Sequence, residues 1–237
     1  MSTTLRSTEL ADLDRAQERE LLIGNGLGGY TALSPIGAPG RRYHGLLVAA
    51  LQPPVARTVL AGPPMLWARA DEEWLPLFSF EIEPGRFSPQ LGAPLAEATV
   101  GVGGVTKVWA LPTGQLTERL SAIPGANAVL VTLQLDAAAA VGVDLVLRLT
   151  ATAHDHHDAL VGDVACEETH LDEGAQQGSW QMSPSWPTVA VRCDGGRLSN
   201  DAGAIRGLFH RHDAARVEAD RSDYAIPLRW SVRLEPG

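Results

Sequence analysis

The sequence predicts an all-β protein, a large antiparallel β-sandwich (supersandwich) with at most short helices. Apolar and polar residues alternate in several segments, which places one row of apolar side chains on one face of a strand. The 24 glycines and 16 prolines are spread along the 237 residues, so few segments can hold a long helix. Turn-forming pairs separate the alternating segments, as is typical of antiparallel sandwiches. These pairs are Pro84-Gly85, Gly103-Gly104, Pro124-Gly125 and Asp194-Gly195.

The chain begins with a polar segment of mixed charge, residues 1–19, in which a short helix starting near Thr8 is expected. Residues 20–237 are expected to form one β-sandwich domain. The clearest strands are expected at residues 78–82, 129–135, 143–149, 189–193 and 226–234. Residues 208–224 are charged and fit either a pair of strands or one helix. The last strand runs almost to Gly237, so we expect this domain to be the N-terminal part of a longer enzyme.

The composition limits the classes of ligand and partner. The 19 basic and 28 acidic side chains give a net charge of -9, and 45% of the residues are hydrophobic, as in a globular protein. The negative charge argues against binding nucleic acid or an anionic membrane, because both require a positive surface. No signal-peptide core or membrane-spanning apolar run is recognised, so a cytoplasmic protein is expected. Cys166 and Cys193 provide neither a disulfide framework nor a cysteine-based metal site.

Residues 24–29, Gly-Asn-Gly-Leu-Gly-Gly, match the G-x-G-x-x-G pattern of dinucleotide-binding loops. That chemistry needs a helix directly after the loop and an acidic residue about 20 positions further on. Pro35 and Gly37 interrupt any such helix, and no Asp or Glu occurs in residues 21–70. We therefore interpret the loop as a tight turn whose glycines allow close backbone approach. No cofactor is expected.

The same acid-free stretch carries four arginines inside an acidic protein. Residues 41–44, Arg-Arg-Tyr-His, place guanidinium, phenol and imidazole groups next to one another, just before an apolar run at residues 46–51. Such a group can hydrogen-bond to sugar hydroxyls, stack on a pyranose ring or bind a carboxylate of a partner. An arginine pair beside a strand is more often an ion-pair clamp, and this interpretation is favoured.

The linked glycine-rich and arginine-rich segments resemble a known family, the N-terminal domain of the bacterial and archaeal type of glycogen debranching enzyme (amylo-α-1,6-glucosidase). The segments that carry the resemblance are residues 20–30 (ELLIGNGLGGY), 41–51 (RRYHGLLVAAL) and 53–57 (PPVAR). Residues 105–109 and 127–133 are similar to strands that follow in that family. The sequence departs from the family at Ile23-Gly24, where the family has a hydroxyl residue before the asparagine.

The resemblance implies a β-supersandwich that precedes an (α/α)6 barrel, and the barrel carries the carboxylates that hydrolyse α-1,6-glucosidic branches. That barrel is absent from these 237 residues. The expected function is a non-catalytic N-terminal domain of a glycoside hydrolase of glycogen catabolism, so the isolated chain is not expected to be an enzyme. The expected partners are the catalytic barrel and an α-glucan, whose cleft the domain helps to shape. Self-association through a patch that the barrel would cover is a further expectation.

Two other groups of residues are chemically competent but have simpler interpretations. Glu81 and Glu83 lie roughly 7 Å apart on one strand face, a separation that glycosidases use. They are opposite the apolar side chains of that strand, so a solvated face is favoured. Residues 154–158, His-Asp-His-His-Asp, are the best metal candidate, with His154 and His156 aligned on a strand. A polar strand end is favoured there, and neither catalytic residues nor a metal are expected.

The six tryptophans are relevant because pyranose rings stack on aromatic side chains. Trp109 and Trp230 alternate with apolar residues and are expected in the core. Trp180 and Trp186 bracket a loop-like stretch and are candidates for an exposed platform or an interdomain contact. The complete set of candidate substrate-binding or interdomain residues is Asn25, Tyr30, Arg41, Arg42, Tyr43, His44, Trp180 and Trp186. Two alternatives stay open: a self-contained small glycoside hydrolase, which predicts turnover, and a stand-alone glucan-binding module, which predicts affinity without turnover.

Overall fold

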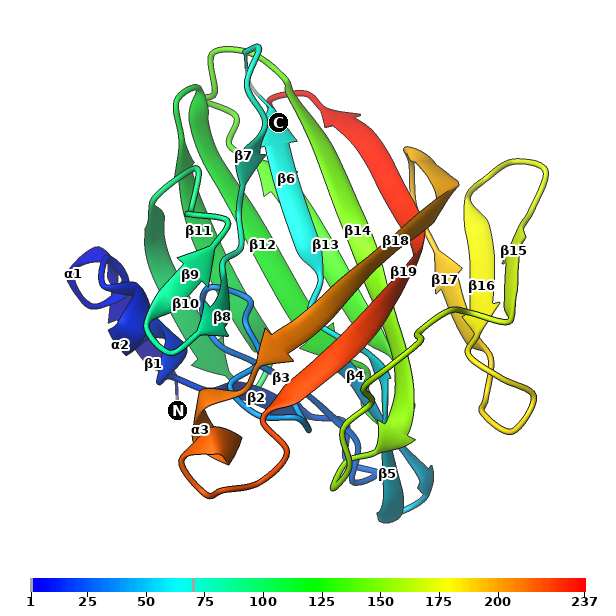
Figure 1. Cartoon of the computed structure of the whole chain (residues 1–237). Helices are drawn as coiled ribbons and strands as arrows, with labels where there is room; N and C mark the ends of the chain where they lie inside the picture. Colours follow the sequence, from blue (N-terminus) through cyan, green and yellow to red (C-terminus); the bar gives the residue numbers. More distant parts are fainter. Residues whose placement is uncertain (1, 70) are drawn as a thin grey trace.

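The computed structural model describes residues 2–69 and 71–237 and has the predicted all-β fold (Figure 1). Strands make up 53% of the structure and helices 6%. The described ranges contain three short helices, at Ser7–Leu10 (α1), Leu13–Gln17 (α2) and Arg211–Ala214 (α3). None of these helices is long and apolar enough to cross a membrane.

The larger sheet has nine strands among the described residues, seven of them in the order β18-β19-β14-β5-β4-β3-β2. Strand β6 pairs with the first half of β14, whereas β5 pairs with the second half of β14. Strand β7 pairs with β6. The bounds are β2 Leu21–Gly24, β3 Tyr30–Leu33, β4 Gly45–Gln52, β5 Val55–Ala61, β6 Met65–Arg69, β7 Leu75–Pro76, β14 Val143–Asp155, β18 Arg197–Phe209 and β19 Arg221–Leu234.

The second sheet has five antiparallel strands in the order β1-β10-β11-β12-β13. Its bounds are β1 Thr3–Arg6, β10 Leu95–Gly101, β11 Gly104–Leu111, β12 Gly114–Ala122 and β13 Val129–Leu135. The N-terminal segment therefore adds an edge strand to this sheet, and α1 and α2 follow that strand in place of one helix. Asp12 caps α2, because its carboxylate accepts the backbone N–H groups of Asp14 and Arg15.

Two smaller β-structures complete the fold. The three-stranded sheet β15-β16-β17 lies beside β18 and β19, and the hairpin β8-β9 lies in front of the five-stranded sheet in the view of Figure 1. Their bounds are β8 Phe80–Glu83, β9 Arg86–Ser88, β15 Glu168–Leu171, β16 Gln177–Gln181 and β17 Val189–Arg192. The stretch 208–224 combines the end of β18, α3 and the start of β19.

The core lies between the two large sheets and follows the alternation in the sequence. In β14, Leu145 and Leu147 are buried, whereas Val146 between them is only half-buried. Leu145 pairs with Val232 of β19, so the apolar rows of the two strands share one face. From the other sheet, Trp109 is fully buried, as predicted. Trp230 packs against the core but is half-buried, with its indole N–H donating to the Gly195 carbonyl.

Candidate functional site

The glycine-rich turn connects the two sheets. It lies between β2 and β3, so a strand and not a helix follows the glycines. The buried Asn25 amide donates to the Ala126 carbonyl at 2.9 Å and to Asn127 Oδ1 at 3.1 Å, in the turn between β12 and β13. Its carbonyl oxygen accepts the Leu27 backbone N–H at 2.9 Å. A Cβ at Gly29 would lie 2.7 Å from the Asn25 amide nitrogen, so this glycine permits the close approach.

The Arg-Arg-Tyr-His segment ends where β4 begins, and its side chains point to two different sets of partners. Arg41 donates through Nε to Glu20 Oε1 at 2.7 Å. The buried His44 accepts the Gly40 backbone N–H at Nδ1, so its proton lies on Nε2, which is 3.6 Å from the same Glu20 oxygen. Burial lowers the pKa of His44 to about 4, so the imidazole is neutral at pH 7.

Glu20 is a carboxylate at neutral pH. Burial alone would raise its pKa, but the hydrogen bond from Arg41 and the positive charge of Arg41 keep the pKa below its usual value. Glu20 begins one of the segments that carry the family resemblance, yet sequence reasoning did not select it as a site residue. Its position at the start of that segment was the available signal.

Arg42 is an ion-pair clamp. Its backbone N–H donates to Asp213 Oδ2 at 2.6 Å, and its guanidinium donates to Glu218 Oε2 at 2.5 Å and to the His157 carbonyl at 2.7 Å. Asp213 is fully buried, which raises its pKa although Arg42 acts in the opposite direction. This is the arrangement that the sequence favours for the arginine pair. Arg42 thereby attaches the segment before β4 to α3 and to the end of β14.

The two tyrosines pack into the same group. The Tyr30 hydroxyl donates to the Tyr43 carbonyl at 3.0 Å, and burial raises the pKa of Tyr30. The Tyr43 ring lies edge-on to His44, with the Arg41 guanidinium 5.6 Å from the ring centroid. The structure therefore brings together Tyr30, Arg41, Tyr43 and His44. Asn25 belongs to the inter-sheet turn instead.

A cavity of about 470 Å³ opens beside Arg41. Its wall combines the polar side chains of Glu20, Arg41 and His212 with aliphatic ones, and Arg19 and Glu18 also line it. The aliphatic part of the wall consists of Leu5, Leu21 and Val100. The two arginines and two glutamates balance in charge, so the cavity favours a neutral ligand over an ion.

Three buried polar atoms at or next to this cavity have no hydrogen-bond partner among the described residues: Arg41 Nη1, His212 Nε2 and Gln17 Nε2. A Cβ at Gly40 would lie 2.9 Å from His212 Cδ2, so the glycine allows the imidazole to lie close to the loop. Burial and then the charge of Arg41 lower the pKa of His212. Buried polar groups normally find partners.

The interpretation of Glu81 as a solvated side chain was wrong. Its carboxylate is buried and accepts two hydrogen bonds of 2.7 Å from Arg211, which also donates to Asp14 at 2.6 Å. The reason is that the Arg211 side chain extends from α3 over the face of β8 that alternation assigns to solvent, and the Gly85 N–H also donates to Glu81 Oε1 at 2.8 Å. Glu83 is exposed beside Arg86. The two glutamates therefore do not face a common substrate.

The two candidate tryptophans differ from the expected exposed platform. Trp180 lies on β16 and is only 3% exposed, so it is not such a platform. The physical reason is that this small sheet packs against the larger one, where a Cβ at Gly178 would lie 3.2 Å from a Leu228 methyl group. Trp186 is half-buried against the core and remains a candidate contact residue.

The metal candidate at residues 154–158 has a different geometry from the one predicted. His154 is buried and hydrogen-bonds through Nδ1 to the Asp155 carbonyl at 2.8 Å. The group that converges consists of Asp155, His156 and His157, and it does not include His154, which was expected to align with His156. Alternation gave the wrong set because β14 ends at Asp155 and a turn follows.

A family model described as "Glycogen debranching enzyme N terminal" matches residues 19–237, nearly the whole chain. The match includes the glycine-rich turn, the Arg-Arg-Tyr-His segment and α3. A search of curated proteins finds no match.

Proposed function

Because this chain belongs to the glycogen debranching enzyme N-terminal family, we propose that it is the non-catalytic β-sandwich domain of a glycogen-debranching glycoside hydrolase. In this proposal residues 20–237 form one domain that packs against an (α/α)6 catalytic barrel and helps to shape the α-glucan cleft. The single observation that carries the proposal is the family match over residues 19–237. The all-β architecture agrees with it.

The environment of the acidic residues supports a non-catalytic role. Glycoside hydrolysis requires two carboxylates on opposite sides of one bond, one of them with a raised pKa. Glu81 is held by Arg211, and Glu83 faces solvent. Glu20 is held by Arg41 and has a lowered pKa, which suits a hydrogen-bond acceptor and not a general acid.

The cavity beside Arg41 supports contact with the glucan. Its volume of about 470 Å³ lies within the range typical of small-molecule sites. The hydroxyl groups of a glucose unit can accept from the Arg41 guanidinium and donate to Glu20, and the aliphatic wall can contact the C–H face of the ring. None of these contacts requires a net charge on the ligand.

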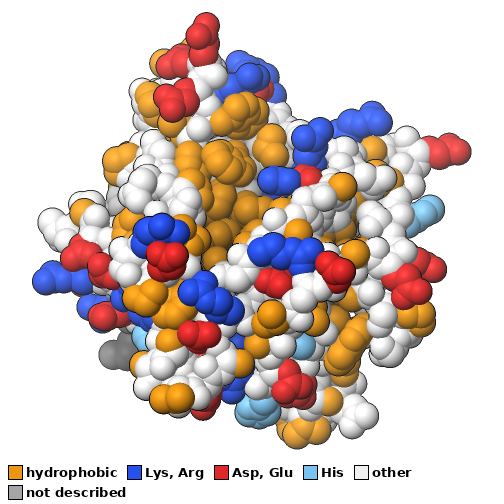
Figure 2. All heavy atoms as spheres, in the orientation of Figure 1, with side chains coloured by type: hydrophobic (Ala, Val, Ile, Leu, Met, Phe, Trp, Pro, Cys, Tyr) orange, Lys and Arg blue, Asp and Glu red, His pale blue; other side chains and the backbone are white. Residues whose placement is uncertain are grey.

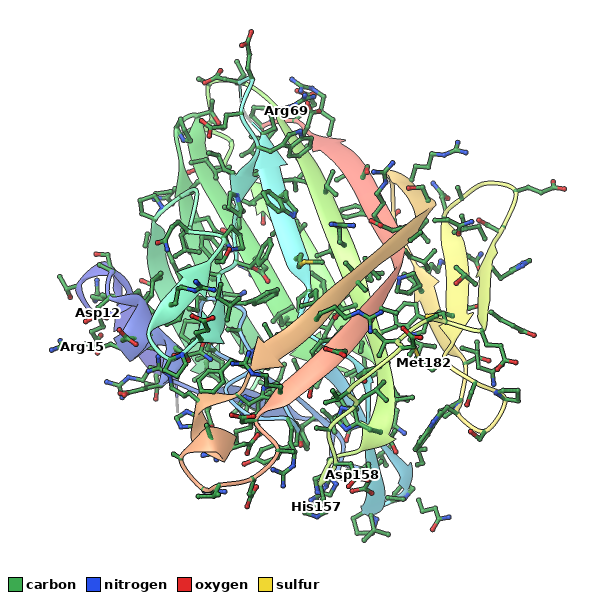
Figure 3. The ribbon with its side chains drawn as sticks, in the orientation of Figure 1. Asp12, Arg15, Arg69, His157, Asp158 and Met182 are labelled. Atoms are coloured by element: carbon green, nitrogen blue, oxygen red, sulfur yellow. The ribbon has the colours of Figure 1, made fainter. Side chains whose placement is uncertain are left out.

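A second surface supports docking of the catalytic barrel. Figure 2 shows apolar side chains gathered in a hollow at the centre of one face, with arginines around its edge. Trp67 of β6 is half-buried, pairs with Val146 of β14 and lies edge-on to the buried Phe78, with ring centroids 5.3 Å apart. Arg69 lies at the top of this face (Figure 3) and pairs with Asp144 at 2.9 Å. An exposed apolar hollow of this kind is typical of an interaction surface.

The glucan contact is tested by calorimetric titration of the chain with maltoheptaose, comparing His212→Ala with the matched control His170→Ala. His212 has an unpartnered ring nitrogen at the cavity, so its removal breaks no side-chain hydrogen bond of the protein, and His170 is exposed on β15. We expect the His212 variant to bind roughly 3–10-fold more weakly, the value of one hydrogen bond, and the control to bind as wild type. No binding by the wild type would remove the glucan contact and leave a structural partner domain. Equal binding by both variants would move the contact away from this cavity.

A further inference from the structure

The turn that follows β14 gathers three metal-ligating side chains. Asp155, His156 and His157 each offer one ligand atom, and these atoms lie within 4.8 Å of one another. His157 and Asp158 project at the end of the molecule opposite Arg69 (Figure 3). This group is distinct from the cavity beside Arg41, and the proposed function assigns it no role.

Four hydrogen bonds hold the backbone of this turn in place. The Asp158 backbone N–H donates to the Asp155 carbonyl at 2.9 Å, and the His156 backbone N–H donates to the Arg57 carbonyl at 3.0 Å. The His157 N–H donates to Asp155 Oδ1 at 2.9 Å, and Arg42 donates to the His157 carbonyl at 2.7 Å. Because the backbone is held in place, only side-chain rotations are needed to bring the three ligand atoms onto one ion.

The imidazole groups are free to act as ligands. His156 Nδ1 is buried, has no hydrogen-bond partner among the described residues, and lies 3.5 Å from Asp155 Oδ1. The His156 and His157 rings lie side by side, with centroids 3.9 Å apart. A histidine ring offers a lone pair to a metal ion when it is unprotonated, as histidine usually is at neutral pH. Neutral imidazole is the form that binds metal ions.

The charges next to the turn are of both signs. Arg42 pairs with Glu218 and also donates to the His157 carbonyl, whereas Arg57 donates to the neutral Gly28 carbonyl at 2.9 Å and keeps its positive charge. Asp158 adds a second carboxylate to the turn. The carboxylates of Asp155 and Asp158 offset the positive charge of these arginines at the ligand group.

We propose that Asp155, His156 and His157 bind a divalent transition-metal ion such as Zn²⁺, with solvent completing the coordination. Two imidazole nitrogens and one carboxylate oxygen suit Zn²⁺, Cu²⁺ or Ni²⁺, whereas Mg²⁺ and Ca²⁺ prefer all-oxygen sites. Because Arg42 holds the His157 carbonyl, the bound ion would fix the turn against the segment that precedes β4. The ion thus has a structural role, independent of whether the domain binds glucan.

The test is a calorimetric titration of the tag-free, chelator-treated chain with Zn²⁺, using His157→Ala, Asp155→Asn and the control His170→Ala. Asp155→Asn removes the charge but keeps an oxygen that can accept the His157 N–H. We expect one Zn²⁺ per wild-type chain, binding weakened roughly tenfold or more by each site variant, and unchanged binding in the control. Circular dichroism checks that every variant is folded. Cu²⁺ electron paramagnetic resonance provides a second readout, with nitrogen coupling from two imidazoles in the wild type and from one in His157→Ala.

Three results would overturn the proposal. These are no saturable Zn²⁺ binding by the folded wild type, equal affinity of the wild type and the folded His157 variant, or loss of binding in the His170 control. None of these results depends on the glucan titration, so the metal-site proposal and the proposed function are tested independently.

Discussion

The inter-sheet connection made by Asn25 gives a prediction that can be worked out in detail. Asn25→Ala removes two hydrogen bonds donated to Ala126 and Asn127 and one accepted from Leu27, all at 2.9–3.1 Å. Asn25 is 3% exposed, so water cannot readily replace these bonds. The change leaves the apolar core intact. Any loss of stability therefore measures the connection between the two sheets.

The expected loss follows from the number of hydrogen bonds. Each is worth about 0.5–1.5 kcal/mol net, and a buried group left unpaired costs more. Since Asn127 keeps its bonds to Ala50, the group most affected is the Ala126 carbonyl. We therefore expect the free energy of unfolding to fall by about 2–4 kcal/mol. Asn25→Asp should cost at least as much, because it places a carboxylate oxygen against two acceptors.

The assay is urea-induced unfolding at 25 °C, followed by tryptophan fluorescence, with Asn200→Ala as the matched control. Asn200 is exposed on β18, so the control should change stability by less than about 0.5 kcal/mol. A change of the same small size in Asn25→Ala would refute the reasoning. The apolar core and the remaining bonds between the sheets, such as those of Asn127 to Ala50, would then suffice to hold the sheets together.

Three further predictions concern buried ionisable side chains. Lys107 Nζ lies 2.9 Å from Glu118 Oε1 in the core. Lys107→Met should lower the free energy of unfolding by about 3–5 kcal/mol, because it leaves a buried carboxylate without its cation. The double variant with Glu118→Gln should recover most of this loss in urea unfolding. Arg211→Ala should lower the free energy of unfolding by a similar amount, because it leaves the buried Glu81 carboxylate without its cation. Arg211→Lys should retain less than half of the lost stability, because lysine cannot donate to both carboxylate oxygens at once. The melting temperature measures both effects. The pKa of His44 is about 4 in the folded state and 6.5 in the unfolded chain. Between these pH values the unfolded chain binds more protons than the folded protein, so stability falls as the pH drops from 6.5 towards 4. This residue accounts for at most about 3 kcal/mol of that fall. His44→Asn should flatten that loss in unfolding measured across this pH range.

The strands could be predicted because alternation is a local property of the sequence. Residues 143–149 and 226–234 were expected as separate strands, and they pair as β14 and β19. The extension of β14 to Asp155 was missed, because the register shifts between Leu149 and Ala151 and breaks the period of two. Which strands become neighbours depends on long-range pairing, which the pattern within one strand does not encode.

The site could be predicted only where its residues are adjacent in sequence. The arginine-rich segment was recognised as unusual, and it does border the cavity. Its partner Asp213 was missed, because Asp213 lies 171 residues from Arg42. The pairing of Glu81 with Arg211 was missed for the same reason, since 130 residues separate them. Alternation assigns Glu81 to the outer face of its strand correctly, but it cannot tell that α3 covers that face. The prediction that Trp180 is exposed was wrong for the same reason, since the larger sheet packs against the small sheet that carries Trp180 and buries it.

The central claim is that this chain carries no glycosidase activity of its own. The most direct test is to incubate the purified chain with a branched limit dextrin and to measure released glucose and reducing ends over hours. A complete debranching enzyme serves as the positive control. The account predicts no release above a buffer blank. Release of glucose by this chain would contradict it and would place the hydrolytic chemistry within these 237 residues.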